Sequence, residues 1–165
     1  MRKWISIVEG LHGGYEDDED FDPSILGPTG TFEVWHASET MITHFNPFTH
    51  FGSREAALHR AGDLNLKGRG YLYRVRLDVS KSCWIRDSGQ DQHPVDGIIE
   101  YLETPLSLPY DEVGVVGNDS HAAAKFLGTY GYDALVYHNG WEDKGSVSWI
   151  GLVPSQMVIQ DCQRI

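Results

Sequence analysis

Histidines and carboxylates in two distant parts of the chain are the side chains best suited to chemistry. His36 ends a run of β-favouring residues, and the stretch His50-Phe51-Gly52-Ser53 precedes an alanine-rich segment. Much later, Glu142 and Asp143 lie together in a polar loop that contains glycine. An imidazole can hold a hydroxyl group by hydrogen bonding, and a carboxylate can stabilise a developing positive centre or accept a proton. These three places form one ordered constellation, which the fold must bring together.

The motifs of several other site classes are missing from the sequence. The eight histidines include no HExxH pair, and the acidic residues include no DxDxDG loop. The chain has no GxSxG nucleophile elbow, no GxGxxG turn and no GxxxxGK[ST] loop. Cys83 and Cys162 form no CxxC pair and allow at most one disulfide. We therefore expect no metal site, and the usual dinucleotide and triphosphate motifs do not apply.

The elements that must position the constellation are strands interleaved with short helices. The clearest strand covers residues 71–79, where apolar side chains occupy every second position. Other runs of β-favouring residues follow the same logic. They predict strands over 32–36, 134–137, 147–153 and 157–159, with a polar loop at 138–146 and a turn at 154–156.

Three short helices are expected between the strands. Ser53 is a suitable N-cap for a helix over residues 53–61, which Gly62 would end. Two further helices are expected over 95–102 and 121–127, the second capped by Asp119 or Ser120. The order of elements predicts a single α+β domain over residues 1–165, built on a mainly antiparallel sheet or pair of sheets.

Composition limits the partners of this domain. The chain has 165 residues and a formal net charge of −11, from 13 Lys and Arg against 24 Asp and Glu. This balance disfavours direct binding to nucleic acid, which depends on Lys and Arg at the phosphates. No apolar stretch is long enough for a membrane span or a signal-peptide core, so we expect a cytoplasmic protein without a membrane partner.

Much of the acidity is local. Residues 9–22 hold seven of the acidic residues and no Lys or Arg. The run Glu16-Asp17-Asp18-Glu19-Asp20 lies in a segment of about residues 13–30 that also contains glycine and proline, so we expect a solvated acidic loop. Its functional alternative is a mimic of nucleic-acid phosphates that docks on a basic partner.

Four blocks in order resemble the ADP-ribosyltransferases. They are Val34-Trp35-His36-Ala37-Ser38, HFGSREAALHRA (50–61), LYRVRLDVSKSCWIRDSG (72–89) and GYDALVYHNGWEDKGSVSWIGLVPSQM (131–157). The resemblance runs from roughly Thr31 to Gln160, and the last block is the most specific. It implies the family's split β-sandwich with short flanking helices, and NAD as the bound cofactor.

The resemblance also implies roles for individual residues. Glu142 would be the carboxylate at the nicotinamide-side ribose, with Asp143 as the alternative, and His36 would hold the adenosine-side ribose. His50 or Phe51 would wall the nicotinamide ring, and the backbone of Ala37 would receive the carboxamide. The catalytic set is then Glu142, His36 and Asp143, and the cofactor-binding set is His36, Ala37, Ser38, His50, Phe51, Gly52 and Ser53.

The expected activity is NAD-dependent mono-ADP-ribosylation of a macromolecule, a protein rather than a nucleic acid. Stand-alone domains of this kind resemble phage-encoded or toxin-type effectors, including anti-CRISPR proteins. Two alternatives stay open. One is a non-catalytic module that binds a partner through the acidic loop, and the other is an enzyme that only hydrolyses NAD.

Overall fold

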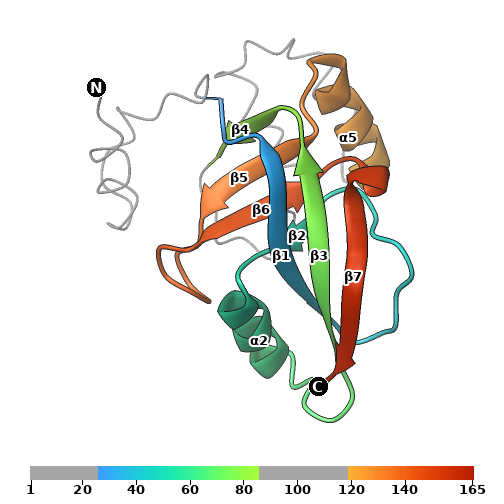
Figure 1. The fold of residues 1–165 in the computed structure, drawn as a ribbon, viewed down its shortest axis with the longest axis vertical. Helices are drawn as coiled ribbons and strands as arrows, with labels where there is room; N and C mark the ends of the chain where they lie inside the picture. The colour runs from blue at the N-terminus through green and yellow to red at the C-terminus, as the bar shows by residue number, and fades with distance from the viewer. Residues whose placement is uncertain (1–25, 86–118) are drawn as a thin grey trace.

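A three-stranded antiparallel sheet forms one layer of the molecule (Figure 1). The structure is a computed structural model and describes residues 26–85 and 119–165. The sheet consists of β1 (Gly30–Ser38), β3 (Tyr71–Val79) and β7 (Met157–Arg164), with β3 in the centre. The alternation predicted for β3 is confirmed, because Tyr73, Val75, Leu77 and Val79 are all buried on one face.

A four-stranded sheet packs against this face. Its order is β2 (Thr49–Phe51), β6 (Val147–Gly151), β5 (Ala134–His138) and β4 (Ser82–Trp84). Only the β4–β5 pair is parallel, and the other pairs are antiparallel. The described part of the chain is therefore an α+β fold with two mostly antiparallel sheets, as predicted from the order of elements.

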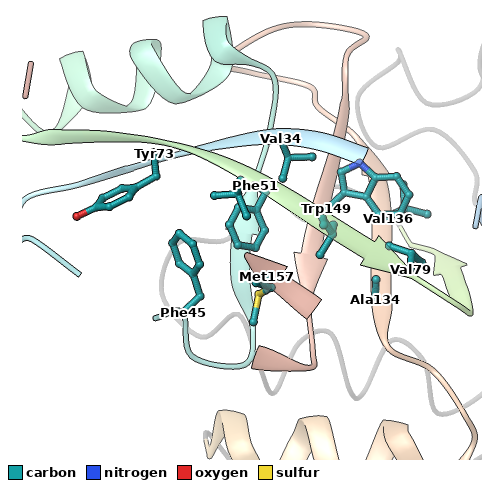
Figure 2. Packing of buried hydrophobic residues seen from close by; sticks show 11 residues of the cluster. Val34, Phe45, Phe51, Tyr73, Val79, Ala134, Val136, Trp149 and Met157 are labelled. Carbon is teal, nitrogen blue, oxygen red and sulfur yellow. The ribbon is translucent and has the colours of Figure 1, made fainter. Parts of the chain in front are cut away.

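Alternate residues of the four-stranded sheet point to opposite faces and pack into two different hydrophobic cores. Ala134, Val136 and Trp149 face the three-stranded sheet and pack with the residues that Figure 2 shows, including Val34, Phe51 and Met157. Their neighbours Leu135 and Ile150 face the other way. They pack with Ala123 and Leu127 of helix α5 (Ser120–Thr129), which thus covers the outer face of this sheet.

Helix α2 (Arg54–Asp63) lies beside β1 and leads out of β2 (Figure 1). Its alanines Ala56, Ala57 and Ala61 are buried, which allows close packing of the helix. Ser53 is its N-cap, as predicted, and Asp119 is the N-cap of α5. The predicted stop at Gly62 is wrong by a short distance, since α2 continues to Asp63 with Leu64 as its C-cap.

Several strand bounds differ from the prediction. β1 and β7 are longer than expected, because each pairs with β3 along its length, from Gly30↔Val79 to Ser38↔Tyr71 and from Leu77↔Met157 to Tyr71↔Arg164. β6 ends at Gly151, and the turn at 154–156 is a single 3-10 turn, η1 (Pro154–Gln156). The predicted helix over 95–102 and the acidic run over 16–20 lie outside the described residues.

The cysteines and the helices bear on two further expectations. Cys83 is buried and Cys162 is exposed, and both are free thiols. None of the helices within residues 26–85 and 119–165 has the length and apolar character needed to cross a membrane.

Candidate functional site

The site begins where β1 meets the connection between β2 and α2. Trp35 and Gly52 exchange two backbone hydrogen bonds, with N···O distances of 2.9 and 3.0 Å. Glycine is favoured here, because a Cβ at position 52 would lie 3.0 Å from Ala56 Cβ and 3.2 Å from Ser148 Oγ, which are both tight contacts. The close approach fixes the end of β1 against the start of α2.

His36 follows directly and is half-buried at this junction. Its ring packs edge-on against Phe45 and Phe51, at centroid distances of 5.4 and 5.8 Å. Its Nδ1 lies 2.8 Å from the carbonyl oxygen of His50. A carbonyl only accepts hydrogen bonds, so Nδ1 carries the proton and Nε2 of the neutral ring is the acceptor atom.

Burial also determines the charge of this ring. Removal from water lowers the pKa of His36 below its ordinary value of about 6.5, and the hydrogen bond to the His50 carbonyl only partly offsets this. The neutral imidazole is therefore the favoured form near pH 7.

His50 and Phe51 lie on opposite faces of β2. Phe51 pairs with Trp149 and is 2 % exposed within the core between the sheets. His50 pairs with Ile150 and is exposed, and its Nδ1 hydrogen-bonds with Tyr137 Oη at 3.1 Å. His50 is thus the accessible one of these two rings, and Phe51 supports the site from within the core.

The loop between β5 and β6 carries the late carboxylates and is organised by Asn139. This residue is 3 % exposed. Its Oδ1 accepts hydrogen bonds from the backbone N–H groups of Trp141 and Glu142 at 2.9 Å and of Asp143 at 3.3 Å. Its Nδ2 donates to Ser148 Oγ at 3.2 Å, which ties the loop to β6.

Asp143 connects this loop to α2. Ser53 Oγ donates to Asp143 Oδ2 at 2.5 Å. Ser53 Oγ also accepts from the N–H of Ala56 at 3.0 Å, which makes Ser53 the helix cap. Glu142 is half-buried beside it, and among the described residues no ion pair or hydrogen bond engages its carboxylate. The two adjacent acids therefore differ in their hydrogen bonding. The Asp143 carboxylate has a partner, and the Glu142 carboxylate has none among the described residues.

The remaining predicted residues lie at the end of β1. Ala37 and Ser38 pair with Leu72 and Tyr71 and are half-buried, and Ser38 Oγ accepts from the N–H of Thr40. Among residues 26–85 and 119–165, no hydrogen bond or ion pair joins Ala37 or Ser38 to the loop at 139–146. The structure therefore links His36, His50, Gly52, Ser53 and Asp143 into one network, with Glu142 next to it, and leaves Ala37 and Ser38 at its margin.

Two cations and two aromatic rings border the network. The Arg54 guanidinium lies 5.7 Å from the centroid of the Trp35 ring, at the start of α2. In the loop, Trp141 is 77 % exposed and Lys144 is also exposed. Within residues 26–85 and 119–165, no group of three or more His, Cys, Asp or Glu side chains is placed to hold a metal ion.

Asn139 and Tyr137 are the residues of the network that sequence reasoning missed. An asparagine before glycine at the start of a polar loop is typical of side chains that bond to nearby backbone N–H groups, so Asn139 could have been singled out. No comparable sequence pattern marks Tyr137.

Comparisons with protein-family models, with curated proteins and with solved structures yield no match to this chain.

Proposed function

We propose that this protein is an NAD-dependent mono-ADP-ribosyltransferase with the split β-sandwich of that family. The observation that carries the proposal is the hydrogen bond between Ser53 and Asp143. It holds the loop with the late carboxylates at the segment that also receives His36. A late carboxylate held close to the segment that receives an early imidazole is what the sequence resemblance requires for one bound dinucleotide.

Glu142 is the catalytic carboxylate in this proposal, and Asp143 is its anchor. Asp143 accepts the Ser53 hydroxyl hydrogen and so fixes the loop. Glu142 has no such partner among the described residues, which leaves its oxygens for the 2′-hydroxyl of the nicotinamide-side ribose. This difference in hydrogen bonding supports Glu142 as the catalytic carboxylate.

His36 takes the adenosine-side ribose. Because Nδ1 is engaged with the His50 carbonyl, Nε2 accepts a hydrogen bond from a ribose hydroxyl. The lowered pKa keeps this nitrogen unprotonated. The interaction contributes to binding of the donor rather than to bond cleavage.

Other contacts with NAD follow from exposure and position. The ring of His50 stacks on nicotinamide, since Phe51 is inside the core. The backbone of Ala37, with Ser38 beside it, receives the carboxamide as the resemblance implies. Arg54 binds the pyrophosphate, because it is exposed at the start of α2 and a planar guanidinium suits phosphate oxygens.

The reaction breaks the glycosidic bond between nicotinamide and ribose. The bonding electron pair leaves with the nicotinamide nitrogen, which becomes neutral, and positive charge develops on the ribose C1′ and ring oxygen. Glu142 stabilises this centre and orients the ribose through the 2′-hydroxyl. A nucleophilic side chain of the target attacks C1′, and its proton passes to Glu142 or to water.

The proposed target is a protein, as for a phage or toxin-type effector such as an anti-CRISPR protein that acts in the cytoplasm. The net charge of −11 disfavours nucleic acid as the acceptor. Acidic and basic side chains balance within the described residues, so the excess acid belongs to the rest of the chain.

The test is release of nicotinamide from NAD by the purified full chain, followed by chromatography. Glu142→Gln should abolish release and leave the thermal midpoint of unfolding unchanged. Glu33→Gln, a carboxylate on the exposed face of β1, is the matched control and should behave as wild type. Equal rates for Glu142→Gln and wild type would overturn the assignment.

Mass spectrometry then separates transfer from hydrolysis. A protein from the recipient cell that gains ADP-ribose only with NAD and the wild-type chain supports transfer. Free ADP-ribose without a modified protein would instead assign the chain as an NAD glycohydrolase. Absence of both products would leave a non-catalytic binding module as the better account.

A further inference from the structure

Asn139 is a deeply buried polar side chain close to the proposed catalytic residue, and the chemistry above gives it no part. It is 3 % exposed, and both ends of its carboxamide are engaged. Burying an amide is unfavourable unless its hydrogen bonds are satisfied, and here they all go to one loop and its neighbouring strand. We propose that Asn139 is a positioning residue for Glu142, an inference that rests on the proposed function.

The acceptor end of the side chain sets the backbone direction at the carboxylate. Oδ1 receives the N–H groups of three consecutive residues, Trp141, Glu142 and Asp143, at 2.9, 2.9 and 3.3 Å. Three N–H groups that converge on one oxygen fix the orientation of the peptide planes on both sides of Glu142. The direction in which its side chain leaves the backbone is fixed with them.

The donor end holds this oxygen in place. Nδ2 donates to Ser148 Oγ at 3.2 Å, and Ser148 is 1 % exposed in the centre of β6. The backbone N–H of Asn139 also donates to the Ser146 carbonyl at 2.8 Å, which closes the base of the loop. Hydrogen bonds of Asn139 thus connect the backbone at Glu142 to the sheet, and the hydrogen bond of Asp143 connects the same loop to α2.

This arrangement predicts a specific kinetic effect. Glu142 acts on the developing positive charge, so its misplacement reduces stabilisation of the transition state more than binding of NAD. Asn139→Ala should lower kcat for NAD cleavage by about 10- to 100-fold and change KM by no more than about twofold, because misplacement by about 1 Å has costs of this order.

Two variants separate positioning from folding. Ser148→Ala removes the partner of Nδ2 and a similar share of buried hydrogen bonding, but leaves the three N–H groups on Oδ1. It should lower the thermal midpoint, and it should lower kcat by less than Asn139→Ala does, because the three N–H groups still converge on Oδ1. Asn139→Asp keeps an oxygen acceptor for the three N–H groups and should restore most of kcat.

The second readout is independent of activity. Amide hydrogen exchange measured by NMR should accelerate at Trp141, Glu142 and Asp143 in Asn139→Ala, and to a smaller extent in Ser148→Ala. Faster exchange together with the loss of kcat supports the proposal. Unchanged exchange, or faster exchange with wild-type kcat, would overturn it. If the wild-type chain cleaves no NAD, the proposed function fails and the kinetic role of Asn139 fails with it, while exchange still reports on the loop anchor alone.

Discussion

Ser53 donates its hydroxyl hydrogen to the carboxylate of Asp143 across a sequence separation of 90 residues, at a distance of 2.5 Å. The same hydroxyl oxygen caps helix α2 by accepting from the Ala56 N–H. One short side chain therefore joins the first and last parts of the proposed site. The strength of this joint is the first property to measure.

The Ser53–Asp143 pair should show coupling in a double-mutant cycle. Ser53→Ala loses both the helix cap and the link to the loop, and we expect a loss of about 1 to 2 kcal/mol in the free energy of unfolding. Asp143→Asn should cost less. Urea denaturation of the two single variants and the double variant should give a coupling of about 1 kcal/mol, and additivity within about 0.5 kcal/mol would contradict the contact.

Substitution of His50 should affect the binding of NAD, and substitution of Phe51 should affect the stability of the fold. His50→Ala removes an exposed ring and should raise KM for NAD by about 2- to 10-fold, the range for loss of one stacking contact, with little effect on unfolding. Phe51→Ala empties a core position that is 2 % exposed and should cost about 3 to 5 kcal/mol. Steady-state kinetics and urea denaturation of both variants check this, and a stable Phe51→Ala with raised KM would reverse the two roles.

His36 should make the stability of the protein depend on pH. Its pKa is lowered in the folded state by burial, so the unfolded chain binds more protons around its ordinary pKa of about 6.5. This contribution is fully present above about pH 6.5 and is lost as the pH falls from there towards the lower pKa of the folded state.

The comparison of wild type with His36→Gln isolates this effect from other titrating groups. Chemical denaturation between about pH 5 and 8 should show a shallower loss of stability towards acid in His36→Gln, because glutamine does not titrate. The same slope in both proteins would show that His36 is not desolvated in the folded state.

A side chain at position 52 should destabilise the protein. Its Cβ would lie 3.0 Å from Ala56 Cβ and 3.2 Å from Ser148 Oγ, so Gly52→Ala should cost about 1 to 3 kcal/mol through overpacking. Gly62→Ala is the control in the same region, because nothing lies within 4 Å of its added methyl group within α2. It should stabilise the helix by about 0.5 to 1 kcal/mol, and thermal unfolding of the pair checks both signs.

The sequence predicted those elements whose residue pattern indicates which side chains are buried or which residue caps a helix. The alternation over residues 71–79 gave the bounds of β3, and the serine and aspartate caps gave the starts of α2 and α5. β2 and β4 have three residues each, too few for a periodic pattern, and they are strands because β6 and β5 pair with them. The exposed end of β7 is likewise set by β3 rather than by its own pattern.

The site was predictable as a set of residues and not as a set of contacts. Sequence order placed His36, Ser53 and the late carboxylates in one constellation, and the family resemblance favours Glu142 over Asp143. The structure adds that Asp143 has a hydrogen-bond partner, Ser53, that is distant in sequence. The choice between His50 and Phe51 also required the register of β2 on β6, since a shift by one residue would exchange the two faces.

A crystal structure of the Glu142→Gln variant with bound NAD tests the central claim most directly. We expect one bound dinucleotide that contacts both side chains. Its adenosine-side ribose hydroxyl should lie at hydrogen-bond distance from His36 Nε2, and its nicotinamide-side ribose 2′-hydroxyl should lie at the side chain of residue 142. NAD bound elsewhere, or bound without contact to either of these side chains, would contradict it.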